Sequence, residues 1–105
     1  MKLIAVYTTT GTIEEAREIA SSLVQQRLVA CAQISEIESF YTWNTTLQNT
    51  REFRLTLKTT EAKYSAVEAA IRAMHSYELP AIYAVAVQIA YTPYAAWVEE
   101  TSAGN

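Results

Sequence analysis

The chain has 105 residues, of which 50% are hydrophobic and 18% are charged, a balance that predicts one compact globular domain over residues 1–105. Eleven acidic residues against eight basic ones, with no basic run, argue against nucleic acid or an anionic membrane as the main partner. The single cysteine cannot form a disulfide within the chain, which favours a reducing compartment.

The N-terminal half predicts a strand, a helix and a long hairpin. Residues 2–9 are β-branched and aromatic and should form a strand that is buried on both faces over residues 3–6. Thr12 and Glu15 then fit a capping box, with the Glu15 side chain reaching back to the cap, and apolar spacing carries a helix to about Leu28. Two strands, at 29–42 and 51–59, flank a polar turn at 44–50.

The C-terminal half predicts a helix, a strand and a short last helix. Thr59 or Thr60 caps a helix whose buried stripe consists of Tyr64, Val67, Ile71 and Met74. Residues 76–80 connect this helix to a fourth, nearly all-apolar strand at 81–91. Thr92 reads as a helix cap followed by Pro93 at the first helical position, and residues 101–105 should fray.

The order β-α-β-β-α-β predicts the α+β class and a ferredoxin-like sandwich, with one antiparallel sheet and two helices on one of its faces. Right-handed crossovers place the first and third strands in the centre of the sheet. The other face should then carry apolar side chains that a monomer of this size does not leave exposed. Large aromatic residues near the hairpin tip, Phe40, Tyr41 and Trp43, either pack locally or anchor the hairpin on a second copy, and we favour the second copy.

Residues that carry chemistry are few. The chain has one histidine, one cysteine and no aspartate, so it offers no tetrahedral zinc motif and no Ser-His-Asp triad. Cys31 is either a small buried residue or a soft metal ligand, and His75 is either a helix C-terminal group or a metal ligand. Glu52 and Glu78 are either solvated surface residues or carboxylate ligands, and Lys58 is a candidate for binding an anion near a helix N-terminus.

Several segments in order resemble the CutA divalent-cation-tolerance family. The segments are 29–34 (VACAQI), 39–43 (SFYTW), 57–60 (LKTT), 75–80 (HSYELP) and 94–97 (YAAW). Each is a weak match alone, but together they span nearly the whole chain. The resemblance implies a ferredoxin-like subunit in a tight homotrimer, similar in architecture to the PII signalling trimers, that binds copper or another divalent metal ion and catalyses no established reaction.

The sequence departs from the family at positions that bear on metal binding. Family members with assigned copper ligands are expected to use a cysteine in the first strand and a His-His pair after the second helix. Tyr7 and Met74 stand at two of these positions here, so only His75 carries over. Thr45 replaces a glycine that follows the hairpin tryptophan, and Ser35-Glu36 replaces Pro-Gly, which predicts altered turn geometry.

We therefore expect a cytoplasmic, non-catalytic homotrimer with no obligatory cofactor, binding copper or another divalent metal ion weakly. The expected metal ligands are His75, Cys31 and Glu78. The expected intersubunit cleft consists of Tyr41, Trp43, Glu52, Lys58, Tyr77 and Trp97. Three alternatives remain open at this point: a small-molecule or nucleotide sensor that uses the cleft, an enzyme built from Lys58, Glu52, Tyr77 and Glu78, and a purely structural trimer.

Overall fold

A computed structural model describes residues 2–104. The elements in chain order are β1 (Leu3–Thr10), α1 (Ile13–Gln25), β2 (Cys31–Trp43), β3 (Thr46–Thr60), a 3-10 turn η1 (Glu61–Lys63), α2 (Tyr64–Met74), β4 (Ile82–Val87) and α3 (Thr92–Thr101). Every predicted helix and strand is present in the predicted order.

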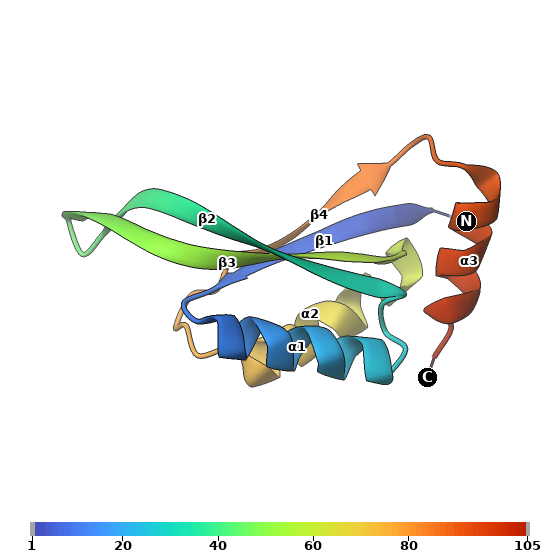
Figure 1. Cartoon of the computed structure of the whole chain (residues 1–105), viewed down its shortest axis with the longest axis horizontal. Helices are drawn as coiled ribbons and strands as arrows, with labels where there is room; N and C mark the ends of the chain where they lie inside the picture. Colours follow the sequence, from blue (N-terminus) through green and yellow to red (C-terminus); the bar gives the residue numbers. More distant parts are fainter. Residues whose placement is uncertain (1, 105) are drawn as a thin grey trace.

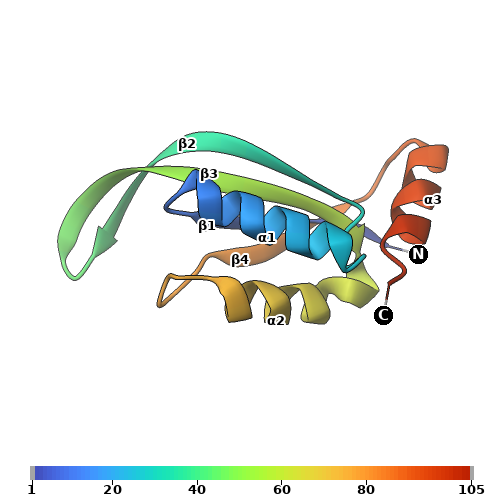
Figure 2. The same ribbon diagram turned by 60° about the horizontal axis from the view of Figure 1, so that its bottom comes forward.

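The four strands form one antiparallel sheet in the order β2-β3-β1-β4. Helices α1 and α2 lie side by side under one face of it, and the β2–β3 hairpin projects past the rest of the sheet (Figures 1 and 2). The α+β class, the central position of β1 and β3, and the two long helices on one face are thus confirmed.

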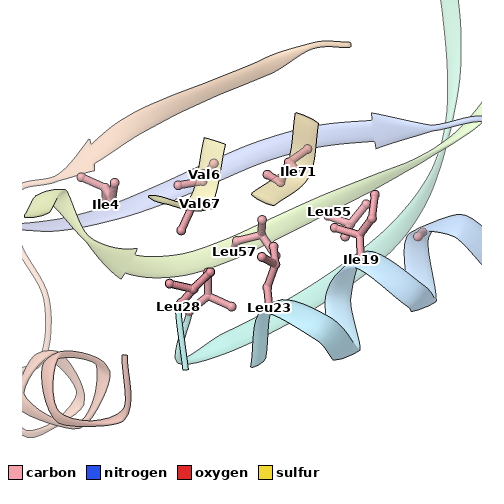
Figure 3. Packing of buried hydrophobic residues seen from close by; sticks show 11 residues of the cluster. Ile4, Val6, Ile19, Leu23, Leu28, Leu55, Leu57, Val67 and Ile71 are labelled. Carbon is pink, nitrogen blue, oxygen red and sulfur yellow. The ribbon is translucent and has the colours of Figure 1, made fainter. Parts of the chain in front are cut away.

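The core lies between the sheet and helices α1 and α2. Residues with even numbers in β1 and odd numbers in β3 point to the helices, as Ile4, Val6, Leu55 and Leu57 show in Figure 3. They meet a set of fully buried helix side chains: Ala16, Ile19, Leu23, Val67 and Ile71. Of the predicted stripe of α2, Val67 and Ile71 therefore lie in the core, and Tyr64 and Met74 pack against it partly buried.

Some predicted boundaries were wrong, and each has a local cause. The fourth strand ends at Val87 because its neighbour β1 begins at Leu3, opposite Val87, so residues 88–91 have no strand to pair with. The polar segment at 44–50 is mostly strand: only Asn44 and Thr45 form the turn, and β3 starts at Thr46. Helix α1 ends at Gln25, and Arg27, at φ 58°, reverses the chain before β2.

The C-terminal segment is held against the domain, contrary to the expected fraying over residues 101–104; Asn105 lies outside the described residues. The Arg27 guanidinium donates to the carbonyls of Glu100 and Thr101, and the Gly104 N–H donates back to the Arg27 carbonyl. Helix α3 begins at Thr92 with Tyr91 as its cap, so Pro93 sits in the second helical position, one residue later than predicted.

Helix α3 packs at one end of the sheet, away from α1 and α2 (Figure 1). Its Val98 forms a second small buried cluster with Leu3 and Ala30. Leu3 alternates with Ile4 along β1, so this cluster lies on the sheet face opposite the main core. Among the described residues, no helix is long and apolar enough to cross a membrane.

Apolar side chains remain exposed at two places. On edge strand β4, Tyr83 and Val85 are 49% and 51% exposed. On the projecting hairpin, Phe40 and Leu47 are 66% and 71% exposed. The expected uncovered apolar surface is therefore present along β4 and the hairpin, whereas the β1 segment 3–6, which was expected to share it, is buried within the chain.

Candidate functional site

A pocket of about 570 Å³ opens where the hairpin leaves the sheet. Strand β4 pairs with β1 only as far as Thr8, and β1 ends at Thr10 opposite Phe53, so β2 and β3 continue without a neighbour beyond this point. The loop after α2 lies in the corner left by these strand ends. The pocket is lined by Thr9, Tyr41, Trp43, Glu52, Ser76, Tyr77, Glu78, Leu79 and Ala81.

Strand register explains why the hairpin residues reach the same pocket. Ile37, Tyr41 and Trp43 are at odd-numbered positions of β2, so their side chains lie on the same face of the sheet. Ile37 pairs with Glu52 of β3, which therefore lies on this face too. Thr9 pairs with Arg54, which also lies on this side of the sheet. Thr9, Tyr41, Trp43 and Glu52 therefore share the face opposite α1 and α2.

The centre of the site is a hydrogen bond between Tyr77 and Glu52. The Tyr77 hydroxyl donates to Glu52 Oε2 at 2.6 Å. Burial of the phenol, and then its hydrogen bond to the Glu52 carboxylate, raise the pKa of Tyr77 well above its ordinary value of 10.0. Glu52 itself is 7% exposed, and no lysine, arginine or histidine pairs with it in the part of the chain that the structure describes.

His75 does not line the pocket, but it holds the Tyr77 backbone through a hydrogen bond. Its side chain is fully buried. Nε2 lies 2.7 Å from the Thr9 carbonyl, to which it must donate, and Nδ1 accepts the Tyr77 N–H at 3.1 Å. Both ring nitrogens are thus occupied, and the ring fixes Tyr77 against the end of β1.

Glu15 also holds the loop. Its carboxylate accepts from the Ser76 N–H at 2.8 Å and from the Ser76 hydroxyl at 2.9 Å, and it lies 3.7 Å from His75 Nδ1. The predicted capping box is therefore half correct: Thr12 accepts from the Glu15 N–H, but the Glu15 side chain turns to the Ser76 loop. The sequence pattern assigned Glu15 only to the helix cap and missed this supporting role.

The remaining predicted residues lie elsewhere. Cys31 begins β2, with its Sγ 3.9 Å from the Tyr94 hydroxyl, and Trp97 stacks on Tyr94. Burial, and then the contact with Cys31, raise the pKa of Tyr94. Lys58 pairs in register with Cys31 and donates to Gln33 Oε1. The structure therefore gathers Tyr41, Trp43, Glu52, Tyr77 and Glu78, and leaves Cys31, Lys58 and Trp97 near the other end of the sheet.

The expected metal ligands His75, Cys31 and Glu78 do not converge within one chain. Over residues 2–104, no three side chains of histidine, cysteine, aspartate or glutamate come together as a metal site would require. The His75 nitrogens are engaged, and the Cys31 thiol is on a distant strand end. The donor set of a single subunit therefore does not fit a preformed copper centre.

The fold and site define a class: a small α+β domain with a projecting hairpin and an aromatic, acidic pocket at its base. The family model described as CutA1 divalent ion tolerance protein matches residues 4–101, and the chain belongs to this family. The divalent-cation tolerance protein CutA of Thermotoga maritima is 36% identical over 99 residues, which cover 94% of this chain and 98% of the relative.

Solved structures of two relatives have the same fold. The crystal structure of CutA1 from Ehrlichia chaffeensis is 36% identical, covers 98% of both chains and superposes with a TM-score of 0.91. The structure of CutA from Archaeoglobus fulgidus, described as a periplasmic divalent cation tolerance protein, is 33% identical with a TM-score of 0.93. It covers 95% of this chain and 98% of its own.

Proposed function

We propose that this protein acts in divalent-cation tolerance as a homotrimer that binds metal ions without catalysing a reaction. Membership in the CutA1 family supports the role in tolerance. The observation that supports assembly into an oligomer is the exposed apolar surface of the hairpin and of β4. The proposal includes a cytoplasmic location, because the free thiol of Cys31 suits a reducing compartment.

The projecting hairpin supports assembly through both of its faces. Phe40 and Leu47 lie on the face toward the helices, and both are more than half exposed. Trp43 lies on the opposite face, at the pocket, and is 42% exposed. A neighbouring copy that covers this hairpin and the apolar edge of β4 would remove these side chains from water, which is the main driving force for association.

Metal binding in this proposal is weak and does not use the imidazole. Glu78 is exposed at the mouth of the pocket and is available as a carboxylate ligand, whereas His75 is not. A divalent ion bound mainly by exposed carboxylates keeps much of its hydration and binds loosely. Copper(II) should bind more tightly than zinc, following the usual order for divalent ions.

Light scattering and titration calorimetry test these two parts separately. The trimer requires a solution mass of three times the chain mass of 11.7 kDa at micromolar concentration. The metal part requires measurable Cu(II) binding that weakens in Glu78→Gln and persists in Cys31→Ser. A monomeric mass would overturn the assembly, and absence of any Cu(II) heat would overturn metal binding.

A second function is favoured by one observation, the pocket itself. Its volume of about 570 Å³ lies within the range of small-molecule sites, about 300–1,000 Å³, and much exceeds the space that a metal ion needs. We therefore propose, as the alternative, that the trimer senses a small molecule at this pocket. Ligand-dependent stabilisation of the intact protein against heat would support it.

A further inference from the structure

One carboxylate on the sheet face opposite α1 and α2 has no cation in its own chain. Glu52 is 7% exposed, and the one group that bonds to it within residues 2–104 is the neutral Tyr77 hydroxyl, on Oε2. Neither ion pair of this part of the chain includes Glu52. A buried carboxylate is costly unless it is paired with a cation or fully hydrogen-bonded. Because a neighbouring copy covers this hairpin in the proposed trimer, the positive charge is expected from that copy.

Strand register limits which basic residues share this face with Glu52. Even-numbered residues of β3 point away from α1 and α2, and two of them, Arg54 and Lys58, are basic. The positions that β1, β2 and β4 place on this face hold no lysine or arginine. Arg51 of β3 lies on the opposite face, where it pairs with Glu36. The choice is therefore between Arg54 and Lys58.

The two basic residues differ in what they already contact. The Arg54 guanidinium lies over the ring of Tyr7, 5.8 Å from its centroid. The Lys58 ammonium donates to the neutral Gln33 Oε1 at 3.2 Å and pairs with no carboxylate of residues 2–104. Lys58 is also separated from Glu52 of its own chain by about 20 Å of extended β3. It can therefore pair only with a Glu52 of another subunit.

Exposed aromatic side chains lie near both of these charged groups. Tyr41 and Trp43 are exposed at the acidic pocket, and Tyr94 and Trp97 are exposed on α3, near Lys58. The hairpin and α3 are at opposite ends of the molecule (Figure 1). Tyrosine and tryptophan are enriched at protein interfaces. Contact between unlike ends of identical subunits is the geometry that closes a ring, as a trimer requires.

We propose that the ammonium of Lys58 of the partner subunit pairs with the Glu52 carboxylate, so that two subunits together complete the pocket. The Tyr77 hydroxyl holds Oε2 of this carboxylate, which leaves Oε1 for the ammonium. The acidic pocket of one copy then meets the basic end of the next, and this charge complementarity fixes how two otherwise apolar surfaces align. The inference rests on the proposed trimer and names a residue pair that crosses its interface.

A double-mutant cycle on trimer dissociation tests this pair. Light scattering over a dilution series, in a fixed concentration of urea, gives the protein concentration at which half of the trimer has dissociated. Lys58→Met leaves the buried Glu52 carboxylate without its cation and should raise this concentration at least about tenfold. Glu52→Gln should raise it too. The double variant removes both charges, so it should dissociate no more easily than Lys58→Met alone.

Arg54→Met is the matched control, because it removes the other basic side chain of the same sheet face. Its effect should simply add to that of Glu52→Gln, as it does for groups that do not interact. Coupling of Glu52 to Arg54 and not to Lys58 would overturn the proposal. Circular dichroism checks that each variant folds.

A cross-link in the wild type replaces the cycle if a variant does not fold. A carbodiimide joins a carboxylate and an amine that are in contact through an amide bond. We expect a peptide that links Glu52 to Lys58 in digests of the covalently joined chains, and the separation of these residues along β3 excludes a link within one chain.

The failure of this pair is distinguishable from the failure of the trimer. A monomeric mass for the wild type would overturn the trimer and the pair with it. A trimeric wild type in which the effects of Glu52→Gln and Lys58→Met simply add would overturn the pair alone. Where the cross-link replaces the cycle, joined chains that lack the Glu52–Lys58 peptide would do the same.

Discussion

The hydroxyl of Tyr77 donates a 2.6 Å hydrogen bond to the carboxylate of Glu52, joining the loop after α2 to the strand β3 at the point where the hairpin leaves the sheet. A neutral phenol donating to a carboxylate is a charge-assisted bond, stronger than one between neutral groups. It ties the position of the loop to the base of the hairpin, so a ligand or a neighbouring subunit that moves one must move the other.

This bond predicts a specific dependence of stability on alkaline pH. Below about pH 10 the Tyr77 phenol is neutral in both the folded and the unfolded chain. Above that value the unfolded chain releases the proton while the folded chain, whose Tyr77 pKa is raised, retains it, so the free energy of unfolding falls as pH rises. Tyr77→Phe should cost about 1–3 kcal/mol at neutral pH, and this cost should shrink above pH 10.

Urea unfolding of the wild type and Tyr77→Phe at neutral and alkaline pH measures this difference. Tyr83→Phe serves as the control, because its ring is 49% exposed and lies on β4 outside the pocket. A cost for Tyr77→Phe that stays constant up to strongly alkaline pH would show that the phenol is not held by Glu52.

His75 should matter for stability and not for copper. Removal of the imidazole in His75→Ala leaves the Thr9 carbonyl and the Tyr77 N–H without partners in a buried place, and we expect a loss of about 2–4 kcal/mol in the free energy of unfolding. His75→Gln, which keeps one polar group in reach, should lose less. Calorimetric titration of the folded variants with Cu(II) should match the wild type, and a tenfold weaker affinity would restore the imidazole as a ligand.

The hairpin should carry much of the assembly energy. Trp43→Ala is expected to reduce the stability of the assembled protein by about 3–5 kcal/mol per buried site and to lower the solution mass at low concentration. Ile89→Ala is a suitable control, because Ile89 is 92% exposed between β4 and α3. Equal mass and equal melting temperature for both variants would show that Trp43 serves only its own chain.

Local pattern was enough to predict the fold. Period-two and helical spacings identified all the strands and helices, because residues such as Val6, Leu57 and Ile71 must point to one core whatever surrounds them. The ends of the helices and strands were predicted less well, because they depend on contacts with other parts of the chain. The end of β4 is determined by where β1 begins, and the C-terminal segment is held by Arg27, a contact between residues far apart in the sequence that no local pattern reveals.

Only part of the site was predicted, because the site too depends on contacts between residues far apart in the sequence. Glu52 and Tyr77 were expected in one intersubunit cleft with Tyr41 and Trp43. The structure brings these four residues together in a pocket of a single chain, and the contribution of a second subunit stays a prediction. From its chemistry His75 was either a helix C-terminal group or a metal ligand, and the resemblance to the CutA family favoured the metal ligand. Its burial depends on Thr9 and on the loop after α2, both of which are brought to the helix end by the tertiary fold.

The hairpin turn contains a residue type that is unfavourable for the backbone conformation at its position, and this leads to a further prediction. Asn44 and Thr45 connect β2 to β3 with φ values of 52° and 62°. A two-residue turn with both residues at positive φ suits Asn at the first position and Gly at the second. Thr45 is β-branched, and the left-handed conformation costs a residue with a side chain about 1–2 kcal/mol. The Thr45 hydroxyl recovers little of this, through an exposed contact with the Asn44 carbonyl.

Thr45→Gly should therefore stabilise the protein by about 1 kcal/mol, the relief of strain outweighing the greater freedom of glycine in the unfolded chain. Thr46→Gly is the matched control: the same change one residue later falls in β3, where glycine weakens a strand by about 0.5–1 kcal/mol. Urea unfolding midpoints at one fixed protein concentration compare the two, because the proposed assembly would make stability depend on concentration. Equal destabilisation by both substitutions would mean that residue 45 is not left-handed and that the hairpin closes through a different turn.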